Sequence, residues 1–249
     1  EDFHSLWADY RIVPRRLYPR LETFTSLNSL TRFVGQGGRA KANVLRYIGQ
    51  RRRSERLLKC VRANMMLGWI KKNFDARIVF VVRHPAAVVL SQAKSMRAWK
   101  PQRTIEAYRQ DPRLLEVLDR DTQQLLFANL TDIEALTLSW CIENSIAFRQ
   151  AEQSGIPVVH YEILVQKGLP EWERILSALE LSVLPDQELI LQPSQQTWGG
   201  KAKDARLVRQ YARWMQEIDG DTASKIQDIL ALTGITSYSI KQPLPLIGA

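Results

Sequence analysis

The chain lacks the features that would place it in several common protein classes. No stretch approaches the roughly 18 consecutive apolar residues of a membrane-spanning helix, no signal peptide is visible, and there is no internal repeat. Only two of the 249 residues are cysteines, Cys60 and Cys141. One falls in an expected strand and the other in an expected helix. They therefore predict two buried free thiols rather than a disulfide, which favours a reducing compartment such as the cytoplasm.

A further absence concerns nucleotide binding. A nucleotide-binding α/β domain usually opens with a strand, a glycine-rich turn and a helix. The glycines in Gly35-Gln36-Gly37-Gly38 follow no expected strand and precede no G-K-[S/T] sequence. They predict an ordinary loop.

What is present indicates a folded, basic α/β protein. Apolar residues make up 45% of the chain, enough for a sizeable core. The formal charge of +9 suggests a polyanionic partner without choosing among a nucleotide, a sulfated glycan, a nucleic acid or an acidic lipid. Expected strands at 57–61, 78–82 and 158–161 are separated by helices, among them a long one from Asp132 to about Gln153. This alternation is typical of a parallel sheet flanked by helices.

The most informative segment is 77–91. Ile78 to Val82 is a short run that is apolar on both faces, as in a central strand of a parallel sheet. Arg83 follows, and Pro85 begins a helix that we expect to reach about Arg97. A cation at a strand end beside the free N–H groups of a helix predicts an anion site, to which Ser91 adds a hydroxyl.

Two parts of the chain together resemble the sulfotransferases that use 3′-phosphoadenosine 5′-phosphosulfate (PAPS). Val82-Arg83-His84-Pro85, with Ser91 eight residues after the arginine, resembles the segment with which that family holds the 3′-phosphate of PAPS. Val159-His160-Tyr161-Glu162-Ile163-Leu164 resembles the family's next landmark, V-x-Y-E-x-L. Looser likenesses extend the resemblance over about 57–240.

The resemblance implies a three-layer, P-loop-like α/β fold. It also implies transfer of a sulfuryl group from PAPS to a hydroxyl or amine without a metal, leaving adenosine 3′,5′-bisphosphate. It assigns Arg83 and Ser91 to the 3′-phosphate and Tyr161 to the adenine side of the nucleotide. A polar loop then either closes over the nucleotide or is simply solvated; its candidate ligands are Trp198, Gly199, Lys201 and Lys203. The acceptor is a small molecule, carbohydrate or lipid rather than a nucleic acid, and neither its identity nor the oligomeric state is specified.

The chain departs from the family's pattern in two places. The loop that holds the 5′-phosphosulfate is absent, and Glu1-Asp2-Phe3-His4 resembles a segment that follows this loop, so we expect a single domain over 1–249 that is incomplete at its start. Lys59 stands where cytosolic members carry K-x-H, but the histidine is missing; this lysine either reaches the sulfate or caps a strand. Glu1 and His4 are the candidate general bases, whereas His84 and His160 are expected to be structural.

Two other functions are compatible with the same residues. A sulfotransferase-like domain without catalysis would bind a polyanion or nucleotide through its basic residues. A P-loop kinase-like enzyme would share the sheet order and require ATP and Mg²⁺.

Overall fold

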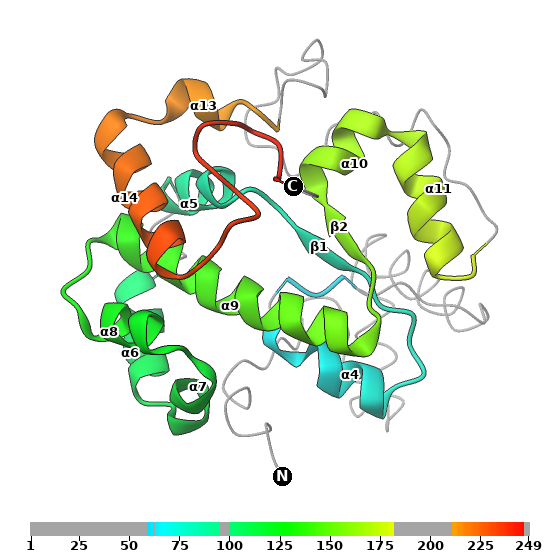
Figure 1. The fold of residues 1–249 in the computed structure, drawn as a ribbon, viewed down its shortest axis with the longest axis horizontal. Coiled ribbons are helices and arrows are strands. Elements are labelled where there is room, and N and C mark those ends of the chain that lie inside the picture. Colours follow the sequence, from blue (N-terminus) through cyan, green and yellow to red (C-terminus); the bar gives the residue numbers. More distant parts are fainter. Residues whose placement is uncertain (1–58, 62, 95–99, 182–210, 247–249) are drawn as a thin grey trace, which may run out of the picture. The chain divides into compact units, whose positions relative to one another are not determined.

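The computed structural model describes residues 59–61, 63–94, 100–181 and 211–246. The chain divides into two compact units, Glu1–Cys60 and Val61–Ala249, and the helices and strands of the described residues all belong to the second (Figure 1). They are, in order, η2 (Asn64–Met66), α4 (Leu67–Asn73), β1 (Phe80–Val82), α5 (Pro85–Ala93), α6 (Pro101–Arg109), α7 (Pro112–Val117), α8 (Arg120–Phe127), α9 (Asp132–Ser154), β2 (Val158–His160), α10 (Tyr161–Lys167), α11 (Leu169–Ala178), α13 (Trp214–Glu217) and α14 (Gly220–Leu232).

The long helix α9 organises the second unit. It packs against β1 and against α4, α5, α6, α8 and α14, so its apolar residues form the middle of the core (Figure 1). Its start is fixed by a capping box, in which the Thr131 hydroxyl accepts from the Glu134 N–H and the Glu134 carboxylate accepts from the Thr131 N–H. Its end is fixed by Gly155, which has φ 60°. These two signals explain why the expected boundaries are nearly those observed.

Gly155 offers a clean test of backbone strain. A Cβ added there meets nothing within 4 Å, so Gly155→Ala is expected to cost about 1 kcal/mol through the left-handed backbone alone. The matched control is Gly220→Ala at the first position of α14, where space is also open and φ is not positive. Urea unfolding of both variants checks the prediction; equal stabilities would contradict it.

The described residues contain one small sheet, in which β1 and β2 pair in parallel with Phe80 opposite Val158 and Val82 opposite His160. Phe80 and Val82 are buried in the core that includes α9. The expectation that this strand is buried on both faces is wrong for Val81, whose side chain is 55% exposed. The strand is also shorter than the apolar run 78–82, because only Phe80 to Val82 take part in the ladder.

Other details of the sequence-based assignment also need correction. Lys59, Cys60 and Val61 lie outside any strand, so the described end of the expected strand 57–61 is not extended. Cys60 is exposed rather than buried, whereas Cys141 is buried and free as expected. Tyr161 is the first residue of α10 and not the last of a strand. The described part of the chain is therefore mostly helical with a two-stranded parallel sheet, which is an α/β arrangement in the broad sense.

The last described segment, residues 233–246, is largely irregular and returns from α14 across the unit (Figure 1). Its Tyr238 is 1% exposed and lies against both His84 and Trp140. This segment therefore joins α9 to the turn between β1 and α5. Among the described helices, none is long and apolar enough to cross a membrane.

Candidate functional site

The candidate site lies where β1 and β2 end. Val82 and His160 form the last pair of the parallel ladder, so Arg83 and Tyr161 leave the sheet side by side. The Arg83 guanidinium carbon lies 5.1 Å from the centre of the Tyr161 ring, within the range of a cation–π contact. Arg83 is exposed and Tyr161 is partly exposed. The two residues thus present a held cation to solvent at the carboxyl ends of parallel strands, where ligands of open α/β sheets bind.

A buried polar layer lies directly behind this pair. The N–H of His84 donates to Glu162 Oε1 at 2.8 Å, and both residues are 0% exposed. The Tyr238 hydroxyl lies 3.4 Å from Glu162 Oε2 and 2.8 Å from His160 Nδ1. Burial raises the pKa of the Glu162 carboxyl, while the His84 N–H and the Arg83 charge oppose that shift. Both carboxylate oxygens of Glu162 and the Tyr238 hydroxyl therefore have partners.

His84 is the N-cap of α5 and has both ring nitrogens engaged. Nδ1 accepts from the Ala86 N–H at 3.2 Å, which leaves Nε2 to carry the proton and donate to the Ser239 carbonyl at 3.2 Å. Its ring stacks on Trp214 at 4.2 Å between centroids. Burial lowers the pKa of His84 to about 4, so the ring is neutral near pH 7. Buried and hydrogen-bonded at both ring nitrogens, His84 supports the turn between β1 and α5, which is the structural role expected of it.

The same contacts occupy N–H groups at the start of α5 that were expected to be free. Pro85 has no N–H, and the N–H groups of His84 and Ala86 are bound by Glu162 and by the His84 ring. The prediction that free N–H groups at the start of α5 hold an anion is therefore wrong for these donors. The exposed group at this edge that would attract an anion is the Arg83 guanidinium, with the helix dipole as a smaller contribution.

Within the second unit, no contact described for Arg83 or Tyr161 involves Ser91. Ser91 is exposed on α5, about two helical turns beyond Arg83. Lys59 is exposed and belongs to the first unit. The predicted bases and loop ligands lie outside the described residues: Glu1, His4, Trp198, Gly199, Lys201 and Lys203. Among the described residues, no group of three or more His, Cys, Asp and Glu side chains is placed to hold a metal ion.

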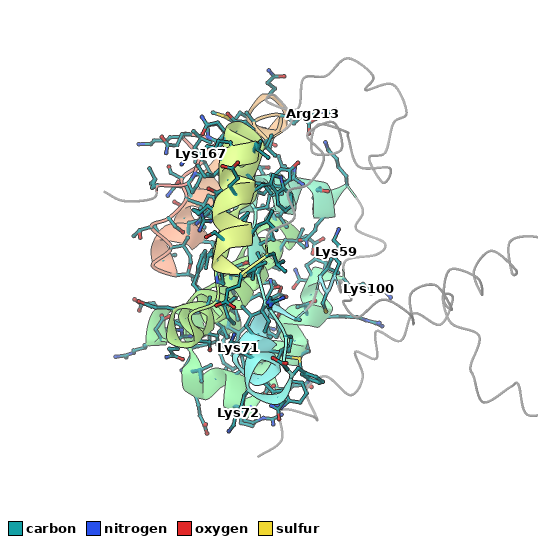
Figure 2. The ribbon with its side chains drawn as sticks, turned by 90° about the vertical axis from the view of Figure 1, so that its right-hand side faces the viewer. Lys59, Lys71, Lys72, Lys100, Lys167 and Arg213 are labelled. Atoms are coloured by element: carbon teal, nitrogen blue, oxygen red, sulfur yellow. The ribbon has the colours of Figure 1, made fainter. Side chains whose placement is uncertain are left out.

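The basic excess of the sequence is not carried by the described residues. Acidic and basic side chains nearly balance over the described residues, so the excess of positive charge lies in the rest of the sequence. Figure 2 shows Lys71 and Lys72 of α4 toward one end of the view and Lys167 and Arg213 toward the other.

Sequence reasoning missed three residues of the site. Glu162 was noted only as part of a motif, although a carboxylate directly after a strand and inside the apolar run 158–165 signals a specific partner. Trp214 stands in a stretch with a loose resemblance to the closing loop of the sulfotransferase family. Neither Trp214 nor Tyr238 carries a local signal of its contact with His84, because these contacts join segments more than 100 residues apart in the sequence. Compared with models of protein families, with curated proteins and with solved structures, the chain matches none.

Proposed function

We propose that this chain is a sulfotransferase domain with the P-loop-like fold of that family, and that it takes PAPS as the donor. The observation that supports this best is the meeting of two motifs. The segments around Arg83 and Tyr161 resemble separate landmarks of the PAPS-dependent enzymes, and their side chains are in contact at the carboxyl ends of β1 and β2. The parallel register of β1 and β2 brings the two motifs to one edge, as a shared nucleotide site requires.

In this proposal Arg83 binds the 3′-phosphate, since a guanidinium offers paired donors that match phosphate oxygens. Tyr161 holds the guanidinium through its ring face and lines the adenine side, and the Ser91 hydroxyl adds a donor from α5. When bound, PAPS supplies the sulfuryl group, which moves to an acceptor oxygen or nitrogen as the bond to the phosphate breaks. The acceptor proton passes to a base, for which Glu1 and His4 remain the candidates, and Lys59 is the candidate cation near the sulfate.

The 3′-phosphate distinguishes this proposal from general nucleotide binding. Adenosine 3′,5′-bisphosphate is expected to stabilise the protein by about 2.7 kcal/mol at a hundredfold excess over its Kd, and 5′-AMP is expected to stabilise it much less. Arg83→Ala should abolish the difference between the two ligands. Arg103→Ala, which removes another exposed arginine on α6, should preserve it. Thermal unfolding at matched ligand concentrations makes this measurement.

The same experiment separates the alternatives. Equal stabilisation by 5′-AMP and the bisphosphate contradicts the assignment of a 3′-phosphate site. Stabilisation by ATP that requires Mg²⁺ favours a kinase-like enzyme. Stabilisation by heparin that is unchanged in Arg83→Ala favours a non-catalytic domain that binds polyanions elsewhere.

A further inference from the structure

We propose that Glu162 is a positioning residue, whose carboxylate fixes the turn that carries Arg83 and so sets the guanidinium against Tyr161. This inference rests on the proposed function for the identity of the anion and on the geometry alone for the positioning. Its basis is the layered arrangement at the ends of β1 and β2.

The first observation is the register. Beyond the last ladder pair, Arg83 contacts Tyr161 on the exposed side, and the next residues, His84 and Glu162, are joined on the buried side. The ladder ends at Val82, and α5 begins at Pro85. The bond from the His84 N–H to Glu162 Oε1 thus continues the pairing of the two strands beyond the ladder through a side chain, immediately before the helix.

The second observation is that Glu162 is held from its other side. Its Oε2 faces the Tyr238 hydroxyl, which in turn faces His160 Nδ1. A consistent set of donors runs from His160 Nδ1–H to Tyr238 and from the Tyr238 hydroxyl to Glu162 Oε2. Both carboxylate oxygens therefore have partners, and the side chain has one well-defined position.

The third observation separates positioning from ligand contact. Glu162 is 0% exposed, so it does not reach a ligand bound on the solvent side of Arg83. A carboxylate in contact with a phosphate would also repel it. Its effect on an anion must pass through the backbone of Arg83 and His84, which makes it distinct from Arg83 itself.

The test compares Glu162→Leu with Glu162→Gln. Leucine leaves the buried His84 N–H without an acceptor, whereas glutamine keeps an acceptor oxygen at Oε1. Although Arg83 is intact, Glu162→Leu is expected to reduce the preference for adenosine 3′,5′-bisphosphate over 5′-AMP by roughly tenfold or more, and Glu162→Gln to retain most of it. Calorimetric titration at a temperature where all variants are folded gives both Kd values.

A stability control and a ligand-free readout keep the inference separate from the proposed function. Leu126→Ala in α8 removes another fully buried side chain, and it should lower stability without changing the ligand preference. The {¹H}–¹⁵N NOE of the Arg83 Nε–H group should fall in Glu162→Leu and not in Glu162→Gln. If wild-type protein does not distinguish the two nucleotides, the proposed function fails and the NOE still decides the positioning. An unchanged Arg83 NOE in Glu162→Leu overturns the positioning role.

Discussion

Trp214→Ala is expected to destabilise the protein by about 3–5 kcal/mol, because it removes a large side chain from the core. Trp214 is 3% exposed and its ring stacks on His84 at 4.2 Å between centroids. Removing the indole leaves a cavity beside the N-cap of α5 and exposes one face of a buried imidazole. The loss should appear as a lower midpoint in urea unfolding with little change in the slope.

Trp214→Phe is the matched variant for this prediction. The indole Nε1–H is buried and has no hydrogen-bond partner in the part of the chain that the structure describes. Phenylalanine keeps a ring against His84 and removes that unsatisfied donor, so two opposing changes nearly cancel. We expect the free energy of unfolding of Trp214→Phe to lie within about 1 kcal/mol of the wild-type value. If Trp214→Ala and Trp214→Phe lower the free energy of unfolding equally, the stacking of a ring on His84 does not stabilise the start of α5.

The sequence predicted those parts of the fold whose signals are local. The expected helix from Asp132 to about Gln153 matches α9, because a capping threonine, Thr131, and a left-handed glycine, Gly155, bound it. Pro85 after a short apolar run predicts the transition from β1 to α5 in the same way. In each case one residue with a restricted backbone or a capping side chain determines where the element begins or ends.

What the sequence did not predict depends on packing between distant segments. Val81 has the composition of a buried strand residue, yet its exposure is set by what lies over the sheet and not by its neighbours in the chain. The occupied donors at the start of α5 were missed for a related reason. Glu162 lies 78 residues after His84, so only the fold reveals that it uses the N–H that was expected to bind an anion.

The residues of the candidate site also fall into those with a local sequence signal and those placed by long-range packing. Arg83 could be chosen from the sequence because it follows a recognisable strand, and Tyr161 because it stands in a motif that resembles a family landmark. The parallel register then brings the two residues together. The residues that hold them, Trp214 and Tyr238 above all, contribute rings and a hydroxyl from a C-terminal region without a motif. The two candidate ligand-binding residues were therefore predictable, and the residues that support them were not.

His84 predicts a loss of stability in mild acid. Burial lowers the pKa of His84 from 6.5 to about 4. Between pH 4 and pH 6.5, His84 is therefore protonated in the unfolded chain and neutral in the folded protein. The contribution of His84 to the free energy of unfolding is therefore complete above about pH 6.5. It declines by about 3 kcal/mol in total as the pH falls toward 4. The raised pKa of Glu162 acts in the opposite direction, because the folded state takes up that proton more readily as the pH falls.

His84→Asn isolates the histidine from the other groups. Asparagine can cap α5 by accepting from the Ala86 N–H and does not titrate, while Glu162, His160 and Arg83 are unchanged. Urea unfolding of both proteins from pH 7 to pH 4 should show the wild type losing about 3 kcal/mol more than the variant over that window. Parallel curves would mean that His84 takes up its proton without leaving its place between Ala86, Ser239 and Trp214. In that case the strand–turn–helix unit that carries Arg83 does not depend on a neutral imidazole.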